Sequence, residues 1–191
     1  MNNLKKAYFA GGCFWCTEAV FLRLKGVKKA IPGYSGGNYE NPTYEQVCSG
    51  ITGHAETVLI EYDSDLISYE MLLDVFFRTH DPTTINRQGN DVGKHYRSAI
   101  FYTDLEQKNY AENFIKKCNE EGLFKKRIVT QVEPLKEFYT AENYHMNYFE
   151  LNQNQPYCEY VIAPKIEKFK LKFKSELKLI RFLIQKDLKI F

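Results

Sequence analysis

The sequence has little that would place the chain in a membrane or in a disulfide-stabilised secreted class. None of its apolar runs approaches the length of a membrane-spanning helix. Its cysteines number five, and an odd count in a chain of this length is unlike the framework of a small secreted domain. The apolar stretch 7–10, which follows two lysines, is too short for a signal peptide and continues into glycines. We therefore expect a reduced protein in the cytoplasm.

The sequence also lacks internal repeats, low-complexity linkers and a strong excess of one charge. Its formal net charge of +2 gives no indication of a nucleic-acid partner. Hydrophobic residues make up 44% of the chain and include 14 Tyr and 14 Phe, enough for one sizeable core. We expect a monomer with a single catalytic domain over residues 1–170, followed by a basic C-terminal helical extension over 171–191.

This basic extension admits two interpretations. Its apolar residues recur at helical spacing, with Lys and Arg on the other faces, and are Leu177, Ile180, Ile184, Leu188 and Phe191. One interpretation is a helix packed on the body of the protein, which we favour slightly. The other is a basic amphipathic segment that contacts a membrane surface or a partner.

Strand-like and helix-like segments alternate along the chain and predict an α+β fold. Helical patterns begin at Ser68, a good N-cap, and at Thr103, where Glu106 completes a capping box before an end at Gly122. Two long loops, 32–55 and 80–97, are of the kind that usually carries function in a compact domain. Runs rich in β-branched and aromatic residues predict strands at 6–10, 27–31, 56–62, 98–102 and 128–132.

The most informative segment is GGCFWCTE at 11–18. Its two glycines permit a tight turn, and apolar residues then repeat at helical spacing until Gly26. Cys13 is therefore expected in the first turn of a helix, beside free backbone N–H groups and the positive end of the helix dipole. Such a position lowers the pKa of a thiol. A thiolate flanked by Phe14 and Trp15 suggests a nucleophile that faces an apolar substrate group.

The two long loops contain further motifs in a fixed order. They are GYSGG at 33–37, GHAE at 53–56 and NRQGND at 86–91. Together with GCFWC, these motifs resemble the A-type peptide methionine sulfoxide reductases, over roughly residues 6–170. The resemblance implies reduction of the S epimer of methionine sulfoxide, free or in proteins, with no metal or organic cofactor. We expect a two-layer sandwich in which a mixed sheet with a ferredoxin-like core is flanked by helices and long loops.

The resemblance also implies roles for residues that carry the chemistry. Cys13 matches the nucleophile that attacks the sulfoxide sulfur and becomes a sulfenic acid. Glu56 matches the proton donor, which burial next to aromatic side chains would keep protonated. Tyr44 and Tyr96 match the two phenols that hydrogen-bond the sulfoxide oxygen and assist proton delivery.

Three further residues match the substrate-binding part of the family's site. Phe14 and Trp15 correspond to the walls around the methyl group, and Asp91 corresponds to a residue that orients the substrate. The chain departs from the usual pattern at two positions: His95 and Met146 stand where Gln is common. Neither change removes a group that the mechanism requires, although both affect the expected peptide contacts.

The resolving thiol, which condenses with the sulfenic acid, has two candidates. Cys158 lies in the C-terminal region where many family members carry this cysteine, and Cys16 lies one helical turn from Cys13. We favour Cys158, with Cys16 as the alternative, and expect an external dithiol such as thioredoxin to reduce the disulfide. Cys118 is expected to be structural, and Cys48 is undecided with a structural role favoured. No catalytic role is evident for His54 or His145.

The Cys13-Phe-Trp-Cys16 motif admits two other interpretations. It resembles half of a zinc or iron–sulfur site, but the remaining cysteines are far apart in sequence. It also has the spacing of a thioredoxin-like redox motif, but with different flanking sequence. Both are less well supported than the reductase.

Overall fold

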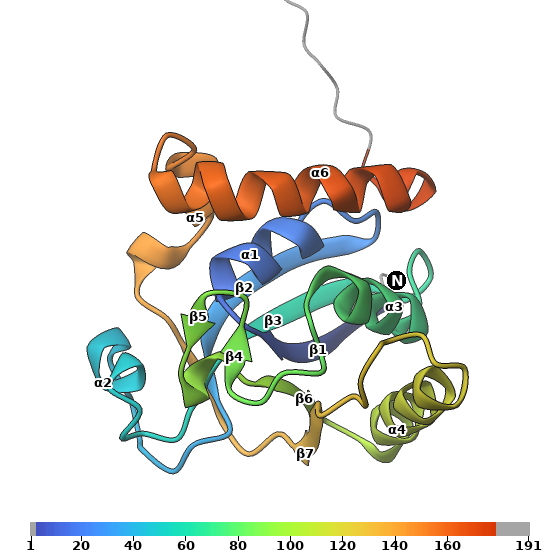
Figure 1. The fold of residues 1–191 in the computed structure, drawn as a ribbon, viewed down its shortest axis with the longest axis horizontal. Coiled ribbons are helices and arrows are strands. Elements are labelled where there is room, and N and C mark those ends of the chain that lie inside the picture. Colours follow the sequence, from blue (N-terminus) through green and yellow to red (C-terminus); the bar gives the residue numbers. More distant parts are fainter. Residues whose placement is uncertain (1–2, 179–191) are drawn as a thin grey trace, which may run out of the picture.

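The computed structural model of the protein describes residues 3–178. Its centre is a six-stranded mixed sheet with the order β7-β6-β1-β3-β2-β8 (Figure 1). β6 and β7 pair in parallel, and the other neighbours are antiparallel. A separate two-stranded ribbon is formed by β4 (Arg87–Gln88) and β5 (Asp91–Val92). The strands of the large sheet are β1 (Leu4–Gly11), β2 (Val27–Ser35), β3 (Ala55–Asp63), β6 (Ser98–Tyr102), β7 (Gln131–Pro134) and β8 (Phe138–Thr140).

Helices cover one face of this sheet. α1, α3 and α4 contact its strands, and α6 lies across the outer side of α1 (Figure 1). The helices are α1 (Phe14–Phe21), α2 (Tyr44–Cys48), α3 (Tyr69–Thr79), α4 (Leu105–Glu120), α5 (Tyr148–Leu151) and α6 (Ala163–Lys172). Short 3₁₀ turns occupy Lys94–Tyr96, Asn143–His145 and Lys174–Glu176, and a π-helical turn, Cys158–Ile162, precedes α6.

The central strand β1 shows why both faces of the sheet are buried. Successive side chains of a strand point to opposite faces. Ala7 and Phe9 join the large core beneath the helices, whereas Tyr8 and Ala10 join a smaller cluster on the other face. The described residues thus form one α+β domain, as predicted, with helices flanking a mixed sheet.

Most of the predicted strands are confirmed. The predictions at 6–10, 27–31 and 56–62 fall inside longer strands, and 98–102 coincides with β6. The prediction at 128–132 is displaced, because β7 begins only at Gln131. The backbone of Ile128 instead donates a hydrogen bond to the side chain of Asn119 at 3.0 Å, which places it under α4 rather than in the sheet.

The helix starts are partly as predicted. Ser68 caps α3 by accepting a hydrogen bond from the backbone N–H of Met71 at 3.2 Å. The start of α4 lies one residue later than predicted, because the carboxylate of Asp104 caps it by accepting from the N–H of Gln107 at 2.9 Å. Carboxylates are among the strongest N-caps and also interact favourably with the helix dipole.

The C-terminal part of the described chain remains on the body of the protein. α6 continues past residue 170 to Lys172, and Leu177 forms a β-bridge with Leu24. The predicted helical extension over 171–191 lies, from 179 onward, outside the described residues. Across residues 3–178, the structure contains no helix with the length and apolarity needed to span a membrane.

Candidate active site

Cys13 lies at the junction between β1 and α1, at the N-cap of the helix as the sequence predicts. Its carbonyl oxygen accepts hydrogen bonds from the backbone N–H groups of Cys16 at 3.1 Å and Thr17 at 3.3 Å. Gly12 makes the turn with φ +88, and a Cβ there would lie 2.5 Å from the Gln88 side chain. The site therefore requires glycine next to the nucleophile, both for the backbone angle and for space.

The ionisation of Cys13 differs from the prediction. Burial raises the pKa of Cys13 well above its usual value, and the neighbouring Cys16 and Glu56 add to this effect. The pKa of Cys16 is instead lowered to about 7, because Cys13 hydrogen-bonds to it and Lys165 lies nearby. The prediction that the helix N-terminus lowers the pKa of Cys13 is therefore wrong. The two thiols therefore interact strongly, and the pKa of Cys16 is the lower of the two.

Glu56 is the buried acid of the site. It opens β3 and is 1% exposed, and its Oε2 accepts a hydrogen bond from the backbone N–H of Phe14 at 2.9 Å. Burial raises the pKa of Glu56 to about 8, with a contribution from the charges of Asp91 and Cys16. The Phe14 hydrogen bond opposes this shift but does not cancel it. The carboxyl group is thus protonated at neutral pH and holds a proton beside the nucleophile.

The structure brings the two predicted phenols to the same place. Tyr44 begins α2, and Tyr96 ends the 3₁₀ turn Lys94–Tyr96. Burial raises the pKa of each phenol, and in both cases the charge of Glu56 is the next cause. The charge of Cys13 also acts on Tyr96. Both hydroxyl groups therefore remain protonated hydrogen-bond donors near the acid.

Aromatic side chains surround the beginning of α1. Phe14 is 1% exposed and stacks on Tyr44, with ring centroids 6.2 Å apart and an interplanar angle of 19°. Trp15 stacks on Tyr148 with centroids 3.7 Å apart and an angle of 6°. Its indole N–H donates to Nδ1 of His145 at 3.0 Å. His145, for which no catalytic role was predicted, thus fixes the orientation of Trp15.

Asp91 hydrogen-bonds to Tyr157, a residue that was not predicted to belong to the site. The Tyr157 hydroxyl donates a hydrogen bond to Oδ2 of Asp91 at 2.6 Å and also hydrogen-bonds to the Cys13 thiol. Burial raises the pKa of Tyr157, and the charges of Cys13 and Cys16 add to this. In the sequence, only the position of Tyr157 next to Cys158 could have indicated a role in the site. A tyrosine in a polar loop is otherwise too common to be informative.

Glu142 is a second residue that the sequence did not reveal. It accepts hydrogen bonds from the Tyr34 hydroxyl at 2.7 Å and from the backbone N–H of Tyr44 at 2.9 Å. It thereby ties α2 to β2, which positions Tyr44 in the site. Tyr34 belongs to the GYSGG motif and is 0% exposed, so only half of this pair had a sequence signal.

The remaining cysteines occupy different environments. Cys158 is 0% exposed and shares an apolar cluster with Cys13 and Cys16. Burial raises the pKa of Cys158, and the charge of Cys16 contributes. Cys118 lies in the main core, away from the site. All of these thiols are free.

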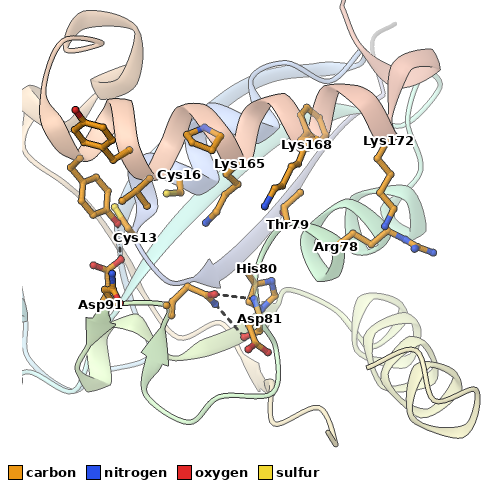
Figure 2. Close-up of a pocket in the computed structure, with 18 of the residues that line it drawn as sticks. Cys13, Cys16, Arg78, Thr79, His80, Asp81, Asp91, Lys165, Lys168 and Lys172 are labelled. Atoms are coloured by element: carbon orange, nitrogen blue, oxygen red, sulfur yellow. Dashed lines mark hydrogen bonds between the residues drawn. The ribbon is translucent and has the colours of Figure 1, made fainter. Parts of the chain in front are cut away.

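A groove of about 840 Å³ leads to the nucleophile (Figure 2). Cys13, Cys16 and Asp91 line one end of it. The side chains of α6 that point into it include three lysines, Lys165, Lys168 and Lys172. Glu56 and the two predicted phenols do not line this groove, so it reaches the nucleophile without reaching the acid.

Metal ligation does not explain the Cys13–Cys16 pair. Within residues 3–178, no third ligand-type side chain groups with these two thiols. The single group of three in that range is Cys48, Glu56 and His95. The interpretation of the motif as half of a metal site is therefore not supported, because no further ligands join Cys13 and Cys16 among the described residues.

Comparisons with known proteins agree with the geometry. A family model described as peptide methionine sulfoxide reductase matches residues 5–177. The peptide methionine sulfoxide reductase MsrA of Nautilia profundicola is 57% identical over 173 residues, which is 91% of this chain and 98% of the relative. The protein of the same name from Acinetobacter baumannii strain AYE is 53% identical over 175 residues, 92% of this chain and 99% of the relative.

Solved structures show the same fold. Mxr1 from Saccharomyces cerevisiae in reduced form matches with a TM-score of 0.74 at 32% identity, covering 81% of this chain and 89% of that one. Methionine sulfoxide reductase A of Corynebacterium diphtheriae matches with a TM-score of 0.71 at 34% identity, covering 80% of this chain and 76% of that one. The family model matches most of the sequence, and the matches to relatives above 50% identity extend over nearly the whole length of those relatives. The chain therefore belongs to the peptide methionine sulfoxide reductase family.

Proposed function

We propose that this protein reduces the S epimer of methionine sulfoxide, free and in proteins, to methionine. The observation that supports the proposal is the burial of Glu56, which raises its pKa to about 8, together with the hydrogen bond that it accepts from the backbone N–H of Phe14, the residue after Cys13. A sulfoxide sulfur is a poor electrophile unless its oxygen receives a proton during attack. The site supplies the nucleophile and the proton within one small volume.

The first step begins with the shared proton of the thiol pair. Cys13 passes its proton to the Cys16 thiolate and attacks the sulfoxide sulfur as a thiolate. Glu56 gives its proton to the sulfoxide oxygen, while the Tyr44 and Tyr96 hydroxyls donate hydrogen bonds to it. The oxygen is transferred to the sulfur of Cys13, so methionine leaves and a sulfenic acid remains. General acid assistance of this kind contributes about 10²–10⁴-fold.

Substrate binding uses the aromatic surface around α1. Phe14 and Trp15 provide apolar contact for the methyl group of the substrate, and Asp91 orients its polar part. A substrate sulfur that reaches Cys13 has to displace the Tyr157 hydroxyl, because that hydroxyl is hydrogen-bonded to both Cys13 and Asp91. Release of Asp91 from Tyr157 then makes its carboxylate available to the substrate.

Resolution of the sulfenic acid involves the two other thiols of the cluster. Cys16 is hydrogen-bonded to Cys13 and has the lower pKa, which favours it as the first thiol to condense, with loss of water. Cys158 lies in the same cluster, and we propose that it then attacks the resulting disulfide at Cys16. This order keeps Cys158 as a resolving thiol and adds Cys16 as a relay between the two.

An external dithiol completes the cycle, and we assign thioredoxin to this role. Yeast Mxr1, which shares the fold, has been solved in complex with Trx2. No metal or organic cofactor enters any step. We further propose that the protein is a monomer and that it is cytoplasmic, the second of which is supported by its five free thiols. The ferredoxin-like description of its core is supported by the sheet order β6-β1-β3-β2.

The proposal is tested by epimer-resolved consumption of racemic dabsyl-methionine sulfoxide with dithiothreitol as reductant. The wild-type protein should consume the S epimer only, and Cys13→Ser should abolish the reaction. Cys118→Ser serves as the matched control, because it removes a buried thiol away from the site. Folded, reduced wild-type protein that leaves both epimers intact would overturn the proposal.

A further inference from the structure

Three residues with different metal-binding atoms meet behind the nucleophile. Cys48 ends α2, Glu56 begins β3, and His95 lies in the 3₁₀ turn Lys94–Tyr96. Their ligand atoms, one from each side chain, all lie within 4.8 Å of one another. The residues are far apart in sequence, so this arrangement is created by the packing of three separate elements.

The histidine of this group has an unsatisfied polar atom. His95 is 6% exposed, and its Nδ1 is buried without a hydrogen-bond partner. Buried polar side-chain atoms in folded proteins are nearly always paired, so such an atom calls for an explanation. No described hydrogen bond uses either ring nitrogen of His95, so the nitrogen that lies near Cys48 and Glu56 is available to a ligand.

The other two residues are able to join such a ligand. The hydrogen bond from Phe14 occupies Oε2 of Glu56, and no described hydrogen bond engages the other carboxylate oxygen. The Cys48 thiol hydrogen-bonds to the Tyr44 hydroxyl, a contact that a thiolate bound to a metal would retain as an acceptor. A coordinated thiol is deprotonated by the ion itself.

We propose that Cys48, Glu56 and His95 form a binding site for Zn²⁺ that switches the enzyme off. One sulfur, one oxygen and one nitrogen ligand suit this ion, and three protein ligands leave a fourth position open for water. Zinc bonds of about 2.0–2.3 Å place tetrahedral ligand atoms roughly 3.5 Å apart. Closing the group around an ion therefore requires side-chain movements of about an ångström.

Inhibition follows from the chemistry of Glu56 and rests on the proposed function. A carboxylate bound to zinc has given up its proton and cannot protonate the sulfoxide oxygen. The ion also occupies the space beside Tyr44 that the oxygen would enter. Zinc bound to Cys48, Glu56 and His95 should therefore act reversibly and in competition with substrate, and this binding mode forms no bond to Cys13.

The Cys13–Cys16 pair is the competing zinc ligand, and the first experiment removes it. Cys13→Ser/Cys16→Ser protein is titrated with Co²⁺, whose thiolate charge-transfer absorption reports a bound sulfur ligand. We expect one equivalent of Co²⁺ to give this absorption, and the additional change Cys48→Ser to abolish it. An additional Cys118→Ser change is the matched control and should leave it intact. Absence of the band, or its survival after Cys48→Ser, would overturn the site.

The second experiment measures inhibition in a single turnover. Pre-reduced enzyme forms methionine without an external thiol, which would itself bind zinc. Each variant is compared with its own rate in the absence of zinc, and Cys48→Ser and His95→Gln should raise the half-inhibitory Zn²⁺ concentration by at least about tenfold relative to wild type, in line with the effect of lost metal contacts. Equal inhibition of wild type and both variants would refute the switch. Wild-type enzyme without turnover but with the cobalt band would instead refute the reductase and leave the metal site standing.

Discussion

The protonation of Glu56 predicts how stability depends on pH. The folded protein holds a proton on this carboxyl up to pH about 8, whereas the ordinary pKa is 4.5. Between these values the folded state binds a proton that the unfolded chain releases, so the free energy of unfolding falls as pH rises. Below the lower value both states are protonated and the penalty is absent. The substitution Glu56→Gln removes the titration and should remove this loss.

The size of the effect follows from the interval between the two pKa values. One pH unit corresponds to about 1.4 kcal/mol, so the interval from 4.5 to about 8 corresponds to roughly 5 kcal/mol as an upper value. The amide oxygen of Gln can still accept the hydrogen bond that Phe14 donates at 2.9 Å. The stability difference between Glu56→Gln and wild type should therefore grow by roughly 3–5 kcal/mol from about pH 5 to about pH 9.

Urea unfolding at a series of pH values measures this difference, and activity assays accompany it. Glu56→Gln should lower kcat/KM by about 10²–10⁴-fold. Glu18→Gln is the matched control, because Glu18 is also buried and burial raises its pKa to about 7. This control should gain stability at high pH yet keep its activity. A Glu56→Gln difference that does not change with pH would refute a protonated Glu56, whatever the activity shows.

Three further predictions concern the cysteines and Tyr157. Cys16→Ser should move the alkylation of Cys13 by iodoacetamide from a midpoint near the Cys16 pKa of about 7 to higher pH, and an unchanged alkylation profile would contradict proton sharing. Cys158→Ser should retain a full single turnover but lose thioredoxin-supported turnover; equal multiple-turnover rates would remove Cys158 from the relay. Tyr157→Phe should lower KM more than it changes kcat, because the substrate no longer displaces a hydroxyl bonded to Cys13 and Asp91. An unchanged KM would show that this hydroxyl has no part in substrate entry.

The strands and the helix caps show which parts of the fold local sequence patterns predicted correctly. The predicted strand 98–102 coincides with β6, and Ser68 caps α3, because both depend on neighbouring residues and backbone geometry. The edge strand β7 was displaced in the prediction, since its pairing with β6 is a long-range contact. A residue such as Ile128 is apolar enough for a strand, and only its packing under α4 decided otherwise.

The residues of the candidate site also divide into those that the sequence predicted and those that only the structure revealed. The family resemblance that the motifs carry was enough to propose Cys13, Glu56, Tyr44 and Tyr96, and these side chains lie near one another in the structure. Tyr157 and Glu142 were missed because their roles consist of hydrogen bonds to residues 66 and 98–108 positions away. Such contacts leave no local pattern in the sequence.

The ionisation of the thiols shows most clearly what each level of description determined. By itself the sequence determined the family, the reaction and the position of Cys13 at a helix N-terminus, because these depend on residue types in order along the chain. From that position a lowered pKa of Cys13 was predicted. The tertiary structure alone decided that burial raises the pKa of Cys13 and that the hydrogen bond from Cys13, together with Lys165, lowers the pKa of Cys16. The free energy of a charge depends on solvent exclusion and on neighbours brought in by folding, and a linear sequence does not contain either.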